Sequence, residues 1–327
     1  MFKKLVNNLE GEKFCIILGS GFHKQGIGQS SILSNWELLL SKLSSEKSTQ
    51  NYILDFEKHV INKAQNISPQ IEVKASDIEQ TEINHLVNAI KKEQSTVLSK
   101  ESRFKYPKIF NSKIISDVVS LNFDMVAEEL YKKNASKNIK IEWQNKSSFN
   151  QTTNTGKPSQ KSICLNTSFR KIENEEGESI RFWYPHGCIL RPKQISLGVY
   201  RYSKLIGNIE QIRKSYKASE REFHKAGGTN RDEIDLTWFS QIVNKPVLIL
   251  GASISEMEWV MWTVFVFRKR NFAKPQNKLY EFPIFAMTTK EDSLNSNNDF
   301  WFQPLFKGLE FDEQWKLLQK LLNNRNK

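Results

Sequence analysis

Val118-Val119-Ser120-Leu121-Asn122-Phe123-Asp124 is typical of a buried strand that stops at a polar pair and then turns into a helix. Such a junction puts an amide and a carboxylate at the carboxyl edge of a sheet, where open α/β sheets bind their ligands. Two other predicted strands end in similarly unusual residues, at Gly19-Ser20-Gly21 and at His186-Gly187. We therefore expect three distant segments of the chain to converge on one pocket.

The first strand is predicted at residues 13–18, a continuous apolar run of the kind that is buried on both faces of a sheet. Gly19-Ser20-Gly21 ends it, and a helix is expected at residues 35–40 with Ser34 as its N-cap. Glycines in such a turn let a pyrophosphate approach the backbone N–H groups, because no Cβ stands in the way. The glycine spacing departs from the full dinucleotide fingerprint, so a phosphate cradle and a plain turn both stay open.

The rest of the chain alternates strands and helices. The segment Pro246–Leu250 is predicted to be a second buried strand like the first. It ends at Gly251 and Ser253, before a helix that runs through Phe267. Apolar patterns predict further strands at residues 139–143, 180–184 and 282–288, and helices at residues 125–131, 203–225, 235–243 and 312–322. This alternation predicts a single α/β domain over residues 1–327, built on a parallel, doubly wound sheet.

Two segments interrupt this alternation. Residues of about 45–112 are polar, Lys-rich and helix-like, with apolar residues at helical spacing, so we expect a helical insertion that caps the pocket. His59 and His85 lie in this segment and are interpreted as structural or surface histidines. Residues of about 145–161 are rich in Ser, Thr, Asn and Gln, which predicts a flexible loop.

The charge of the chain leaves the class of partner open. Basic residues number 48 against 36 acidic ones, which gives a net charge of +12, but most of them are Lys spread along the chain. A solvated surface and an acidic partner such as nucleic acid are both compatible with this spread, since a phosphate footprint would cluster on one face. Arg268-Lys269-Arg270 is a local basic patch, or equally the solvated end of a helix.

The three cysteines, Cys15, Cys164 and Cys188, form no Cys-x-x-Cys pair, so we expect neither a disulfide framework nor a four-cysteine zinc site. The first residues lack an apolar signal core, and the apolar runs are far shorter than a membrane span. These features predict a soluble, cytoplasmic protein with no membrane contact and no bound metal.

Four short motifs, taken in order, resemble those of the sirtuin-like superfamily. They are Leu18-Gly-Ser-Gly21, Ser120-Leu-Asn122-Phe-Asp124, Pro185-His186-Gly187 and Leu250-Gly-Ala-Ser-Ile-Ser-Glu256. These motifs are spread along the chain, so that the resemblance extends over most of it, apart from the helical insertion and the flexible loop. The resemblance implies a Rossmann-like fold that binds NAD in an extended groove.

The resemblance also implies roles for individual positions. It places Gly19-Ser20-Gly21 against the NAD phosphates, Asn122 near the nicotinamide ribose, and Asp124 in support of the pocket. His186 matches the family's general base, whereas its position alone is compatible with either a base or a structural histidine. Gly251-Ala252-Ser253 matches the turn that lines the adenosine side of the groove.

Departures from the family pattern point to one branch of it. Deacylating sirtuins carry a zinc module with four cysteines, which this chain cannot build. Phe22 and His23 follow the glycine turn where sirtuins favour a small aliphatic residue and a serine, and Glu256 stands where relatives often have Asp. The chain therefore resembles the zinc-less, NAD-hydrolysing effectors of bacterial antiphage defence, which act by abortive infection. His23 is interpreted as either a phosphate contact or a loop histidine.

This branch implies that NAD is a substrate, cleaved to nicotinamide and ADP-ribose. Departure of nicotinamide leaves an oxocarbenium-like ribose, so the reaction needs a base for the attacking oxygen and a polar group that fixes the sugar. His186 and Asn122 suit these two tasks. Such an enzyme also implies a protein partner or oligomerisation that switches it on, because unrestrained NAD loss would kill the host.

Two other functions stay open. The chain can be a binding module that holds NAD, ADP-ribose or, directly or through a partner, nucleic acid, and its positive charge and the departure at Phe22 favour this alternative. Protein deacylation is less favoured, because the zinc module is missing.

Overall fold

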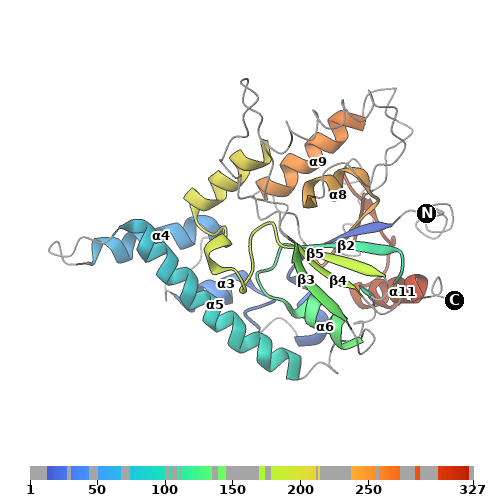
Figure 1. The fold of residues 1–327 in the computed structure, drawn as a ribbon, viewed down its shortest axis with the longest axis horizontal. Coiled ribbons are helices and arrows are strands. Elements are labelled where there is room, and N and C mark those ends of the chain that lie inside the picture. The colour runs from blue at the N-terminus through green and yellow to red at the C-terminus, as the bar shows by residue number, and fades with distance from the viewer. Residues whose placement is uncertain are drawn as a thin grey trace.

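The structure is a computed structural model that describes residues 13–27, 31–43, 51–67, 74–99, 104, 109–110, 112–134, 139–144, 169–173, 178–210, 213, 237–252, 254, 258–272, 284–287 and 301–323. Within these ranges the chain forms an α/β fold around an eight-stranded sheet (Figure 1). The predicted flexible loop at residues 145–161 and the predicted site residue Ser253 lie outside the described residues.

The sheet has the strand order β3-β4-β5-β2-β1-β6-β7-β8. Its members are β1 (Phe14–Leu18), β2 (Ile115–Ser120), β3 (Lys140–Gln144), β4 (Phe169–Glu173), β5 (Ser179–Trp183), β6 (Val247–Leu250), β7 (Ile284–Ala286) and β8 (Gln303–Pro304). From β5 to β8 all neighbours pair in parallel, whereas β4 is antiparallel to both β3 and β5. Every residue of β1 and β6 is buried, which is why both strands are continuous apolar runs.

Helices cover both faces of the sheet (Figure 1). One face carries α8 (Trp238–Asn244), α9 (Trp259–Phe272) and a helix over residues 199–210. The other carries α3 (Trp36–Leu40), α5 (Ala75–Ser99), α6 (Val126–Asn134) and α11 (Phe311–Asn323). Because strand side chains alternate between faces, Ile16 and Leu18 belong to one apolar core and Cys15 and Ile17 to the other.

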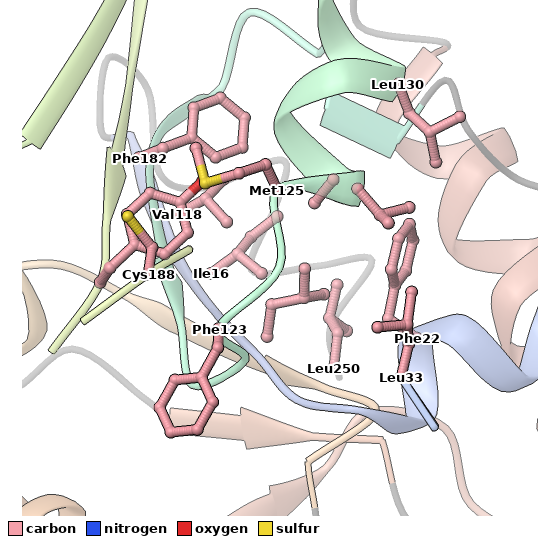
Figure 2. Packing of buried hydrophobic residues seen from close by; sticks show 14 of the residues in the cluster. Ile16, Phe22, Leu33, Val118, Phe123, Met125, Leu130, Phe182, Cys188 and Leu250 are labelled. Atoms are coloured by element: carbon pink, nitrogen blue, oxygen red, sulfur yellow. The ribbon is translucent and has the colours of Figure 1, made fainter. Parts of the chain in front are cut away.

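The loop after β2, which holds Asn122 and Asp124, is anchored by apolar neighbours. Figure 2 shows Met125 beside Val118 and Phe182, with Phe123 pointing away from them on the same loop. All four side chains are buried. The loop therefore has a fixed course between β2 and α6.

The remaining described helices are α2 (Gly21–Ile27), α4 (Tyr52–Gln65) and the short 3₁₀ helix η3 (Pro192–Gln194). The helices α4 and α5 fall where the sequence predicts a helical insertion. None of the described helices is both long and apolar enough to cross a membrane.

Three predictions about the elements are wrong. The sheet is mixed rather than parallel, because the connection from β4 to β5 is too short for a crossover and forces an antiparallel pair. The N-cap of α3 is Asn35 instead of Ser34, since Asn35 Oδ1 accepts the amide of Glu37 over 2.8 Å. The helix expected from residue 203 already begins at residue 199.

Candidate functional site

Two glycine turns meet backbone to backbone at the carboxyl edge of the sheet. The amide of Gly21 donates to the carbonyl of Gly251 over 2.7 Å. A Cβ on Gly19 would lie 2.5 Å from the Cα of Ala252. A Cβ on Gly251, whose φ is 62°, would lie 2.3 Å from the amide nitrogen of Phe22. Glycine is required at these positions because the turns after β1 and β6 touch each other.

This contact bears on the choice between a phosphate cradle and a plain turn. The N–H groups of Gly19 and Gly21 already donate to the end of β6 and to its turn, and those of Phe22 and His23 donate within the first turn. A phosphate at this turn would have to compete with these hydrogen bonds. The close packing of the two turns alone accounts for the glycines.

A small, partly open pocket lies beside this edge. It brings together three predicted site residues from two strand ends, Ser20, Asn122 and Asp124. The complete lining is Ser20, Ile32, Leu33, Asn35, Trp36, Leu39, Ile90, Asn122, Phe123 and Asp124. The pocket is thus polar toward the sheet and apolar toward α3 and α5.

Behind the pocket, Asp124 and Asn122 are tied to a buried histidine. Asp124 Oδ2 lies 2.9 Å from His23 Nε2, and Asp124 Oδ1 accepts the amide of Val126 at the start of α6. Asn122 Nδ2 lies 3.3 Å from the same His23 nitrogen. His23 Nδ1 is buried and has no hydrogen-bond partner among the described residues.

This geometry corrects both interpretations of His23. The residue sits in α2 rather than in a loop, and its side chain is fully buried instead of being presented to a phosphate. Its pairing with Asp124 connects α2 to the start of α6. Sequence reasoning missed this pairing because 101 residues separate the two partners.

His186 is held by a tight turn just beyond β5. The amide of Gly187 donates to the carbonyl of Tyr184 over 2.9 Å, and the amide of Ser196 donates to the carbonyl of His186 over 2.8 Å. Gly187 has a φ of 86°, and a Cβ there would lie 2.4 Å from the carbonyl oxygen of Gln194. The backbone of His186 is therefore fixed, and its side chain is buried.

The partner of His186 is Glu258, a residue that sequence reasoning missed. Glu258 Oε1 lies 3.1 Å from His186 Nε2 and accepts the Tyr202 hydroxyl over 3.2 Å, and its Oε2 accepts the Tyr52 hydroxyl over 3.3 Å. Burial alone would raise the pKa of Glu258, but His186 and the two hydroxyl donors outweigh burial and lower that pKa below its ordinary value. Burial, and then the charge of Glu258, raise the pKa values of Tyr52 and Tyr202, so both remain neutral donors.

Asn122 and His186 lie at the same edge of the sheet but belong to different groups. Val119 of β2 pairs with Trp183 of the neighbouring strand β5, and Asn122 and His186 each come three residues after these paired positions. No described hydrogen bond joins their side chains. An aromatic contact links the two groups instead: Trp36, in the pocket wall, stacks on the ring of Tyr52 at 4.8 Å.

A second buried carboxylate, Asp117 in β2, lies within the sheet itself. Arg181 donates to both of its oxygens over 2.7 and 2.9 Å, Lys245 donates over 2.8 Å, and the indole of Trp183 donates over 2.8 Å. Burial would raise the pKa of Asp117, but the charges of Lys245 and Arg181 outweigh it and lower that pKa to about 2. This group is a permanently charged structural network.

The structure divides the basic patch at Arg268-Lys269-Arg270: Lys269 and Arg270 lie in the last turn of α9, where Arg270 is exposed, as expected for a solvated helix end, whereas Arg268 does not fit this interpretation. Arg268 is buried and donates to the backbone carbonyls of Ile242 and Lys245, at the end of α8. It therefore holds α9 against α8 and does not belong to a solvated helix end or to a nucleic-acid surface.

No group of His, Cys, Asp and Glu side chains in the described ranges is arranged to hold a metal ion. The two described cysteines, Cys15 and Cys188, are buried thiols. The fold and the pocket together define an α/β protein with a candidate ligand site at the carboxyl edge of its sheet. The chain matches no protein-family model and no curated protein, so the interpretation of this site depends on its own geometry.

Proposed function

We propose that the chain is an NAD glycohydrolase with a Rossmann-like fold, which cleaves NAD to nicotinamide and ADP-ribose. Support for the fold comes from the strand order. The parallel strands are β1, β2, β5, β6, β7 and β8. Numbered one to six along the chain, they lie across the sheet in the order 3-2-1-4-5-6. This is the order of dinucleotide-binding folds, which bind their ligand where the order reverses, here beside β1.

The observation that carries the proposal is that Ser20, Asn122 and Asp124 line one pocket at the carboxyl ends of β1 and β2, next to this reversal point. These are the positions that the sirtuin-like resemblance assigns to the phosphates, to the nicotinamide ribose and to support of the pocket. Trp36 and Phe123 add aromatic surface that suits a pyridine ring. We infer that the pocket takes the nicotinamide end of NAD.

The chemistry requires a polar group that fixes the ribose and a base that takes a proton from the attacking oxygen. Asn122 supplies the polar group. His186, on the neighbouring strand end, is the candidate base; it lies outside the pocket lining and is linked to it through Glu258, Tyr52 and Trp36. Activation by a protein partner or by oligomerisation, in a cytoplasmic antiphage response, is part of the same proposal.

The test is to incubate the purified protein with NAD and to measure released nicotinamide. His186→Ala and Asn122→Ala are each expected to lower the release at least a hundredfold, since positioned acid–base and polar groups contribute effects of this size. His85→Ala is the matched control, because His85 is 58% exposed on α5 and its replacement is expected to leave turnover unchanged. Unchanged turnover in both site variants would contradict the assignment.

Binding of NAD or ADP-ribose without cleavage is the second candidate. It is favoured by the hydrogen bond between Glu258 and His186, which occupies one nitrogen of the proposed base. In this case ADP-ribose would raise the melting temperature of the protein, Asn122→Ala would abolish that shift, and no nicotinamide would appear under any condition.

A further inference from the structure

The carboxylate of Glu258 collects three side-chain donors from three separate parts of the fold. His186 comes from the turn after β5, Tyr202 from the helix at residues 199–210, and Tyr52 from α4. All three donors are titratable, and no Lys or Arg side chain among the described residues pairs with Glu258. The negative charge of this buried group is therefore balanced only when His186 carries a proton.

The imidazole of His186 has one orientation in this arrangement. Its ring lies parallel to that of Tyr202, with 5.8 Å between the centroids and 6° between the planes. Its Nε2 faces Glu258, and in the described part of the chain Nδ1 makes no hydrogen bond. Because an ionised carboxylate can only accept, a neutral His186 must carry its proton on Nε2, which leaves the lone pair on Nδ1.

We propose that Glu258 is the positioning residue of His186: it fixes the imidazole in the Nε2–H form, makes Nδ1 the basic nitrogen, and stabilises the imidazolium formed during NAD cleavage. The proposal rests on the proposed function and adds to it the identity of the reacting nitrogen. Tyr202 and Tyr52 complete the arrangement, since their hydroxyls hold the carboxylate in place toward His186.

The proton balance follows from this assignment. As the bond between ribose C1′ and the nicotinamide nitrogen breaks, its electron pair leaves with nicotinamide, which becomes neutral. Water forms the new bond to C1′ and gives its proton to Nδ1 of His186. The imidazolium then faces Glu258 through Nε2–H and releases the extra proton to solvent from Nδ1, so that NAD and water yield ADP-ribose, nicotinamide and a proton.

The first experiment is NMR of ¹⁵N-labelled histidine in the full chain, without NAD. The chain has five histidines, and His186→Ala identifies the signal of His186. We expect the wild-type neutral ring to be in the Nε2–H form, and we expect Glu258→Gln to weaken this preference, because a side-chain amide can donate as well as accept. A neutral wild-type ring in the Nδ1–H form, or an unchanged tautomer preference in Glu258→Gln, would overturn the proposal.

The second experiment is nicotinamide release by the same variants. Glu258→Gln is expected to lower kcat about tenfold to a hundredfold at nearly constant KM. Glu258→Asp keeps a carboxylate beside His186, so the ring should stay in the Nε2–H form and kcat should fall less than in Glu258→Gln.

The two experiments separate the proposals. Activity of Glu258→Gln equal to that of the wild type would overturn the positioning role and leave the proposed function intact. Absence of release from the wild type, both alone and with its activating partner, would overturn the proposed function and the catalytic part of this inference, while NMR still decides the pairing of His186 with Glu258.

Discussion

Asp117 and Glu258 are both buried carboxylates that accept several hydrogen bonds, yet their partners are of different kinds. Asp117 is bonded by Arg181 and Lys245, whose charges do not change over the physiological pH range. Glu258 is bonded by His186 and two tyrosine hydroxyls, and burial keeps both tyrosines neutral. The first group is thus an ion-pair network with two permanent cations, while the second has no Lys or Arg partner among the described residues.

The largest difference is expected when each carboxylate is removed. Asp117→Ala leaves a partly buried guanidinium and ammonium without their buried counter-ion and should lower the free energy of unfolding by about 3–5 kcal/mol. Glu258→Ala removes the acceptor of three side-chain hydrogen bonds and should cost about 1–3 kcal/mol. Urea unfolding at pH 7 measures both values, and equal losses would remove the distinction between the two groups.

The second-largest effect is expected at low pH, where protonation of Asp117 should lower the free energy of unfolding. Its pKa falls from an ordinary 3.8 to about 2 on folding, so its contribution is fully present above about pH 4 and is lost as the pH falls through about 2. A shift of this size corresponds to about 2 kcal/mol. Glu258 has the same sign, since its pKa is also lowered. The unfolding free energy of the wild type should therefore fall more steeply below pH 4 than that of Asp117→Asn; parallel curves would contradict this origin.

The smallest effects concern the two tyrosines around Glu258. Tyr202→Phe removes a hydroxyl that donates to Glu258 and lies 3.5 Å from the amide of Val260, whereas Tyr52→Phe removes only the bond to Glu258. Each should cost about 1 kcal/mol, with the larger loss for Tyr202→Phe. Tyr200→Phe is the control, since Tyr200 is 72% exposed and its replacement should be neutral in thermal unfolding. A larger loss for Tyr52→Phe than for Tyr202→Phe would contradict this ranking.

Much of the fold could be predicted because its central strands follow local rules. β1 and β6 are apolar runs ended by glycine, and α11 has a clear helical period, so each appears where the sequence indicates it. The strand β4, Phe169–Glu173, was missed because its alternation of apolar and charged residues is short and weak. It lies next to β5, outside the parallel strands of the sheet.

The site was predictable only in part. Ser20, Asn122 and Asp124 stand at strand ends, and the topology alone brings them to one pocket. Glu258 carries no local signal, because its contact with His186 spans 72 residues. Asp117 had a signal that went unused: a charged residue inside a buried strand requires a buried partner.

The contact between the two glycine turns limits how this edge of the sheet can change. Since Gly19, Gly21 and Gly251 touch other backbone atoms, any side chain at these positions would push the ends of β1 and β6 apart. Changes to the candidate pocket would therefore have to come from its lining side chains, such as Ser20 and Trp36, because the glycine turns beside it have no room for a side chain.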